Sequence, residues 1–131
     1  MRGLLDTSVV VMLSQVAVEQ LPDEPLISAV TLAELSLGPL AAGEPAEAAR
    51  RQVVLQQAEA DFEPLPFDGA CARAFGLVAA SLRASSRKVR PRALDALIAA
   101  TALANGLPLY TATPRDVAGV DGLEVREVSP G

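Results

Sequence analysis

In "GLLDTSVVV", residues 3–11, an acid interrupts a run of leucines and valines. An ionised carboxylate removed from water without a partner costs far more free energy than the packing of one side chain contributes. One interpretation is a buried strand that ends at Leu5, with Asp6 capping the segment that follows. The other is a metal ligand at the carboxyl end of that strand. Asp6 alone does not decide between them.

On either side of this stretch, short apolar runs alternate with longer helical patterns. Strands are expected at residues 2–5, 26–28, within 63–68, at 107–111 and at 123–128. Helices are expected within 27–38, 44–62, 69–82 and 91–106, with a short one near 113–117. Thr31 and Glu34 have the spacing of a capping box, and Gly38-Pro39 is a helix stop. The alternation predicts a single α/β domain over residues 1–131, with a mostly parallel sheet.

Composition excludes several kinds of chemistry. The 131 residues contain no histidine and one cysteine, Cys71, so histidine-based catalysis, cysteine-rich zinc sites and an internal disulfide are all ruled out. The net charge is -5, the wrong sign for broad neutralisation of nucleic-acid phosphates. No stretch has the length of a membrane span and no basic leader is evident, so we expect a cytoplasmic protein.

Four acids are predicted to share one edge of the sheet. Asp6 and Asp116 follow predicted strands, and ligands of open parallel sheets collect at the carboxyl ends of the strands. Glu34 and Asp95 lie in the first turns of helices that begin at this edge. Asp95 also borders the apolar stripe of its helix, where a solvated acid is not expected.

Each acid also has an ordinary structural interpretation. Glu34 could only close the capping box, Asp95 could only favour the positive end of its helix, and Asp116 could only cap the turn after Thr113-Pro114. Convergence would change this, because neighbouring carboxylates repel one another unless they share a proton or a cation. Oxygen ligands suit Mg²⁺ or Mn²⁺, and such sites hydrolyse phosphodiesters without histidine.

At this point the sequence resembles a PIN-domain ribonuclease, and in particular the VapC toxin of VapBC toxin-antitoxin modules. The matching segments run in the family's order along nearly the whole chain: "LLDTSVVV" (4–11), "TLAEL" (31–35), "LPFD" (65–68), "LDALIAATALANGLPLYT" (94–111) and "TPRDVAGVDGLEV" (113–125). The resemblance implies a three-layer domain with a five-stranded parallel sheet between helices. It also implies endoribonuclease activity and a VapB-type antitoxin as partner.

The resemblance assigns roles to individual residues. Asp6, Glu34, Asp95 and Asp116 match the family's acidic quartet, and we expect Asp6, Asp95 and Asp116 to bind Mg²⁺ or Mn²⁺. Thr7 and Ser8 match the polar pair that helps to order this site. Thr113 stands where the family often has asparagine, and Val117 where it usually has phenylalanine.

A basic run lies just before Asp95 and contains Arg87, Lys88, Arg90 and Arg92. Such a run is usually a solvated connector. An acidic ribonuclease must nevertheless hold RNA phosphates, and Arg92, one turn before Asp95, is the best single candidate.

Two other functions remain open from the residues. One is a PIN-like binding module without catalysis. The other is an acidic phosphotransfer protein of the receiver or dehalogenase type, although Ser8 replaces the second acid of a dehalogenase and no lysine follows "PLYT" as a receiver requires. The mean hydropathy of +0.31 is high for a monomer of this size, so we also expect self-association into a homodimer and a covering partner chain. The resemblance implies that the antitoxin groove lies on the helices beginning at Thr31 and Glu44.

Overall fold

A computed structural model describes residues 1–89 and 92–131. Its sheet contains β1 (Arg2–Leu5), β2 (Glu24–Leu26), β3 (Leu109–Thr111) and β4 (Val125–Glu127), all parallel, in the order β2-β1-β3-β4. The connections leave β1 and β3 in opposite directions across the sheet, so the strand order reverses between these two central strands. That reversal is where open α/β sheets place their ligands.

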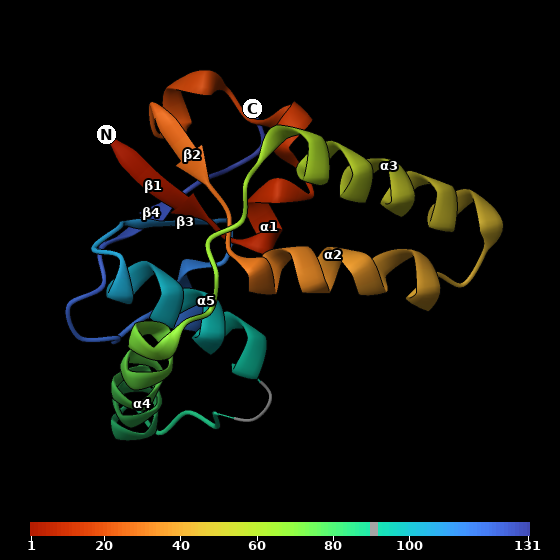
Figure 1. Cartoon of the computed structure of the whole chain (residues 1–131). Helices are drawn as coiled ribbons and strands as arrows, with labels where there is room; N and C mark the ends of the chain where they lie inside the picture. The colour runs from red at the N-terminus through yellow and green to blue at the C-terminus, as the bar shows by residue number, and fades with distance from the viewer. Residues whose placement is uncertain (90–91) are drawn as a thin grey trace.

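Helices cover both faces of the sheet (Figure 1). They are α1 (Thr7–Val10), α2 (Ala29–Ala41), α3 (Pro45–Asp61), α4 (Gly69–Ala84) and α5 (Ala93–Ala104), with 3₁₀ turns η1 (Leu13–Gln15), η2 (Val18–Gln20) and η4 (Pro114–Val117). α2 and α3 form an antiparallel hairpin that extends from the body as an arm, whereas α4 and α5 pack together on the other side (Figure 1). The predicted α/β architecture is therefore confirmed.

Alternation along the strands divides the core between the two faces. Leu4 and Leu109 are buried in the cluster that includes α4 and α5, while their neighbours Leu5 and Tyr110 are buried in the cluster on the α1 and α3 side. Successive strand residues point to opposite faces, so a strand covered on both sides is apolar throughout. This explains why an acid stands out immediately after Leu5.

The fifth strand implied by the resemblance is reduced to one bridged residue. In the described residues the sheet has four strands, and Leu65 pairs with Ser28 in an isolated parallel bridge. The Leu65 amide donates to the Ile27 carbonyl at 2.9 Å, and the Ala29 amide donates to the Leu65 carbonyl at 2.8 Å. Pro64 and Pro66 flank Leu65 and have no N–H to donate, so the ladder cannot extend.

The start and the end of α2 both differ from the expectation. Ser28 is the N-cap, and its hydroxyl accepts from the Thr31 amide at 3.0 Å, so Thr31 and Glu34 form no capping box. The helix also runs through Pro39 to Ala41 instead of ending at Gly38. The extra turn is accompanied by packing of α2 against α3. This packing compensates for the one backbone hydrogen bond that Pro39 removes from the helix.

Within the described part of the chain, no helix has both the length and the apolar character needed to cross a bilayer.

Candidate active site

Asp6 lies at the carboxyl end of β1, where it is both a helix cap and a buried acid. Its carboxylate accepts from the Val9 amide at 3.2 Å and from the Ser8 hydroxyl at 2.5 Å, and only 7% of the residue is exposed. Burial raises the pKa of Asp6, and the hydrogen bonds from Ser8, Thr111 and the backbone oppose that rise. The predicted capping role is thus present, but capping alone does not explain a buried carboxylate.

Thr7 and Ser8 connect Asp6 to the neighbouring elements. The Ser8 hydroxyl accepts from the Ala112 amide at 3.0 Å, which ties the end of β1 to the segment after β3. The Thr7 hydroxyl donates to Glu34 Oε1 at 2.6 Å and lies 3.1 Å from the Thr31 hydroxyl. Glu34 is therefore oriented by α1, since its carboxylate closes no cap of its own helix.

Asp95 lies in the first turn of α5, at the same edge as Asp6, because α5 runs back toward the start of β3. Burial, followed by the negative charges of Asp116, Glu34 and Asp6, raises the pKa of Asp95 to about 6, and Arg92 partly offsets the effect. Repulsion of this kind requires the charges to be close together. The structure thus brings the four predicted acids to one edge of the sheet.

Asp116 is held by an ion pair. It lies in η4, its amide donates to the Thr113 carbonyl at 3.0 Å, and its Oδ1 accepts from Arg92 Nη1 at 2.9 Å. The Thr113 hydroxyl is 3.3 Å from that of Thr111, which joins η4 to the end of β3. Asp116 therefore caps no helix, and Arg92 contacts the acidic site directly.

A pocket of about 490 Å³ combines the basic run with two of the acids. It is lined by Ser86, Arg87, Lys88, Arg92, Asp95 and Asp116. The Arg87 guanidinium donates to the Arg115 carbonyl, which anchors it beside η4. Of the predicted RNA-binding residues, Arg87, Lys88 and Arg92 lie at this pocket, while Arg90 is outside the described residues.

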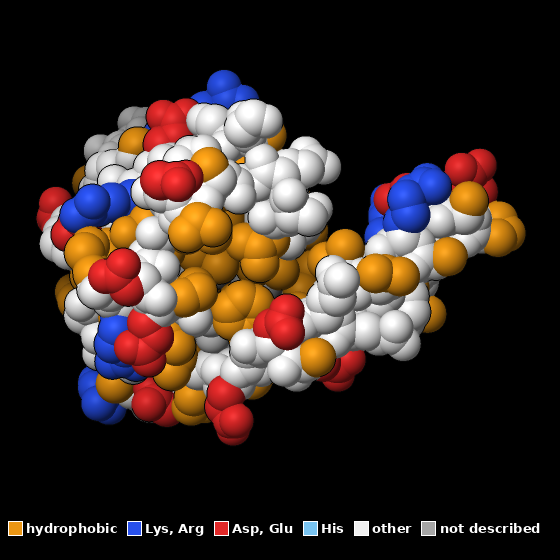
Figure 2. Space-filling view, turned by 90° about the horizontal axis from the view of Figure 1, so that it is seen from above, with side chains coloured by type: hydrophobic (Ala, Val, Ile, Leu, Met, Phe, Trp, Pro, Cys, Tyr) orange, Lys and Arg blue, Asp and Glu red, His pale blue; other side chains and the backbone are white. Residues whose placement is uncertain are grey.

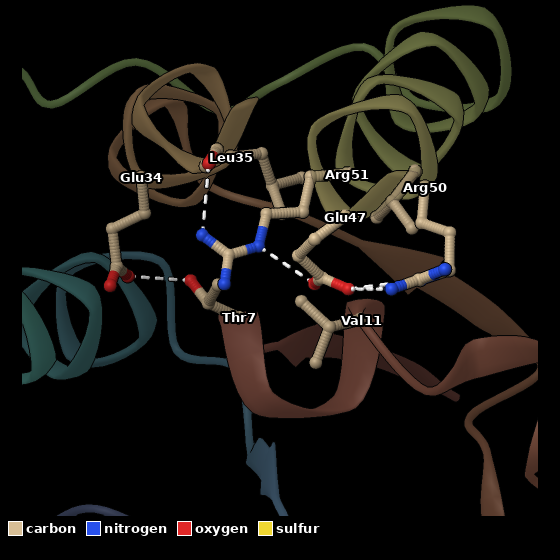
Figure 3. Close-up of a pocket in the computed structure, with 9 residues that line it drawn as sticks. Thr7, Val11, Glu34, Leu35, Glu47, Arg50 and Arg51 are labelled. Carbon is tan, nitrogen blue, oxygen red and sulfur yellow. Dashed lines mark hydrogen bonds and ion pairs between the residues drawn. The ribbon is translucent and has the colours of Figure 1, made fainter. Parts of the chain in front are cut away.

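A second pocket, of about 440 Å³, lies between α1, α2 and α3 on the Glu34 side of the site. Figure 3 shows Glu34 and Thr7 at one end, Glu47 and Arg50 at the other, and the Arg51 guanidinium between them. The sequence analysis did not assign a role to Arg50 or Arg51. Their spacing from Glu47 predicts ion pairs on one helix but gives no sign that this helix approaches Glu34.

The acidic edge suits a hard cation in the type of its ligands. Its oxygens come from four carboxylates, and the raised pKa of Asp95 reflects burial and then repulsion between the acids, which a cation would relieve. In the described residues no three acidic side chains are close enough together to hold a metal ion as they stand. Asp116 is instead paired with Arg92, so this carboxylate is directed toward a guanidinium.

Comparison with known proteins agrees with the fold. The family model described as PIN domain matches residues 4–117. The parallel sheet with helices on both faces is thus, in this chain, the architecture of a PIN-domain protein.

Similar individual proteins define the family of this chain more narrowly than the PIN domain does. Ribonuclease VapC4 of Mycobacterium tuberculosis is 40% identical over 95% of each chain, and Ribonuclease VapC5 of the same organism is 37% identical over 96% of this chain and 93% of that protein. The chain also resembles the crystal structure of VapBC-5, a toxin-antitoxin system of M. tuberculosis, with a TM-score of 0.80 and 38% identity over 97% of each chain. DNA-bound VapBC from Salmonella typhimurium shares the fold at 22% identity and a TM-score of 0.74. The chain belongs to the VapC ribonuclease family.

Proposed function

We propose that this protein is a Mg²⁺- or Mn²⁺-dependent endoribonuclease and the toxin of a type II toxin-antitoxin module. The observation that carries the proposal is the Asp95 carboxyl, whose pKa is raised to about 6 by burial and by the three other acids. A site that crowds carboxylates in this way favours a divalent cation over an empty, fully ionised state. Relatives named as ribonucleases support RNA as the substrate.

Asp6, Asp95 and Asp116 would hold the metal, which supplies activation of water and stabilisation of charge on the phosphodiester. Asp6 is held in place by Ser8 and by the Val9 amide. Asp95 carries a proton in part near neutral pH and would have to lose it in order to hold the metal, because metal ligands are deprotonated. Thr7 orients Glu34 at the margin of the site, and Arg92 and Lys88 face the RNA phosphates.

The test is cleavage of end-labelled RNA in Mg²⁺, in Mn²⁺ and in excess chelator, with analysis of the product ends. Attack by water leaves a 5′-phosphate, and activity disappears in chelator. A 2′,3′-cyclic phosphate, or undiminished activity in chelator, contradicts the proposal. Binding of RNA without cleavage in either metal would instead identify a binding module, for which the Arg92–Asp116 pair is the favouring observation.

The proposed partners are a VapB-type antitoxin and a second copy of this chain. The relevant observation is apolar exposure on the arm formed by α2 and α3: Leu37 is 58%, Leu40 85% and Val53 52% exposed. Figure 2 shows the arm projecting from the body with hydrophobic side chains along it. Exposed apolar surface on a projecting element is typical of a site covered by another chain.

A further inference from the structure

Arg51 is held in the pocket beside Glu34 by two partners. Its Nε donates to Glu47 Oε2 at 2.9 Å, and its Nη1 donates to the Gly38 carbonyl at 3.0 Å. Within residues 1–89 and 92–131, Nη2 has no hydrogen-bond acceptor, and Figure 3 shows it directed toward Thr7. Two of the five N–H donors are thus used to fix the guanidinium, and the others face the pocket.

The charge on the α3 side of this pocket is positive. Arg50 and Arg51 share one carboxylate, Glu47, which leaves one excess positive charge on this wall. Glu34 at the far end belongs to the acidic site. At least five of the 11 Lys and Arg residues of this acidic chain line the two pockets that contain the site acids. Lys and Arg side chains are therefore concentrated on both sides of the acidic edge.

We propose that Arg51 binds a phosphate of the RNA strand on the α3 side of the acidic site, opposite the phosphate contacts of Arg92. The inference rests on the proposed ribonuclease function and extends the substrate path into the second pocket. A strand whose scissile phosphate lies among the four acids has neighbouring phosphates on both sides. One side meets Arg92 and Lys88, and the other meets Arg51.

The geometry favours a phosphate over a carboxylate of a partner protein. The planar fork of Arg51 matches the oxygens of either group in a bidentate contact, so the position of the pocket decides between them. The pocket shares Thr7 and Glu34 with the acidic site, so its occupant is continuous with whatever the acids act on. Glu47 and the Gly38 carbonyl fix the fork in advance, which reduces the entropy lost on binding.

The experiment measures binding of a short, fluorescein-labelled single-stranded RNA by fluorescence anisotropy over a range of salt concentrations. Excess chelator is present, and a gel verifies that the probe is intact. Arg51→Met keeps the packing of the stem and removes the charge. We expect a loss of affinity of roughly 3- to 10-fold and a salt dependence of log affinity shallower by about 0.7, the value for one phosphate contact with a single strand.

Two further variants separate binding from a structural role. Arg126→Met is the matched control, because Arg126 is also an exposed arginine paired with a glutamate, Glu124, but lines neither pocket. It leaves affinity and salt slope unchanged. Glu47→Gln keeps an oxygen that can accept from Arg51 Nε but removes a negative charge from the pocket, so RNA binding stays the same or becomes tighter.

Several outcomes overturn the inference. If the wild type binds and cleaves RNA but Arg51→Met matches Arg126→Met in affinity and slope, the proposed contact is wrong and the ribonuclease function stands. If Arg51→Met and Glu47→Gln lose RNA affinity and melting temperature in parallel, Arg51 only holds the hairpin together. If Arg51→Met weakens only co-purification with an antitoxin, the pocket is a protein-binding site. A wild type that neither binds nor cleaves RNA overturns both proposals.

Discussion

The ionised form of the Asp95 carboxyl is destabilised in the metal-free protein, since its pKa of about 6 lies well above the ordinary 3.8. A group whose pKa is raised on folding takes up protons as the chain folds. Its destabilising effect is therefore present above pH 6, diminishes as the pH falls through 6, and is gone near 3.8. Asp68 acts in the opposite direction, because hydrogen bonds lower its pKa and its stabilising effect is lost in acid.

We predict that the wild-type protein in chelator is most stable between pH 4 and 6. At pH 7, we predict that Asp95→Asn is at least as stable as the wild type. The substitution raises the unfolding free energy by on the order of 1 kcal/mol once screening by solvent is allowed for. Mg²⁺ should raise the melting temperature of the wild type more than that of the variant, which has lost a ligand, and cleavage should be abolished. Thermal melts with and without metal measure these effects.

The opposite pattern would contradict the four-acid site. If Asp95→Asn is clearly less stable without metal and gains as much from Mg²⁺ as the wild type, then Asp95 only stabilises the start of α5. Asp121→Asn is a suitable control, because Asp121 is an exposed acid in the turn before β4 and should change none of these quantities.

At the scale of elements, the start of α2 determines where Glu34 lies. Ser28 is fully buried, accepts from the Thr31 amide, and belongs to the residue pair that links α2 to Leu65. The position of α2 relative to α1 then lets Thr7 reach Glu34. A change at this cap therefore affects both the stability of the fold and the geometry of the site.

Replacement of two N-caps tests this link. Ser28→Ala leaves a buried amide without its acceptor and should cost about 1–2 kcal/mol of unfolding free energy. It should also lower cleavage by more than the loss of folded protein explains. Asp68→Ala removes the cap of α4, where Asp68 accepts from the Cys71 amide at 3.0 Å, and should lower the melting temperature without impairing the cleavage rate per folded molecule. Equal cleavage losses in both variants would show that the cap of α2 has no special relation to the site.

At the scale of the whole molecule, the arm formed by α2 and α3 separates surfaces used for folding from those available to partners. The exposed leucine near its end, Leu40, contributes little to the core because 85% of it is already in solvent. Surface substitutions of this kind usually change stability by less than about 0.5 kcal/mol. Any larger effect of such a substitution must come from an association.

Leu40→Glu is predicted to leave the melting temperature unchanged and to weaken association with the co-expressed antitoxin or with a second copy, by roughly tenfold or more. Co-purification and light scattering measure the two associations. Leu77→Glu is the matched control, since Leu77 is a 69% exposed leucine on α4. Weaker association in the control and not in Leu40→Glu would place the interface on α4.

Local patterns in the sequence were enough to predict the α/β class, the family and the four acids that lie at one edge of the sheet. Apolar runs broken by Asp6, the stripe bordered by Asp95 and the order of the motifs can all be read without knowing the fold. The sequence also located the basic residues Arg87, Lys88 and Arg92 near the site, since they directly precede α5.

Tertiary structure decided the rest, because it depends on which distant segments meet. Thr31 and Glu34 have the spacing of a capping box. In the structure, however, the Ser28 hydroxyl accepts from the Thr31 amide, and the Thr7 hydroxyl donates to the Glu34 carboxylate. Pairing of Arg92 with Asp116 joins residues 24 positions apart, and Arg51 approaches the site only because α3 folds back along α2. Chain spacing predicts contacts within one element, whereas contacts between elements follow from the packing of the sheet and its helices.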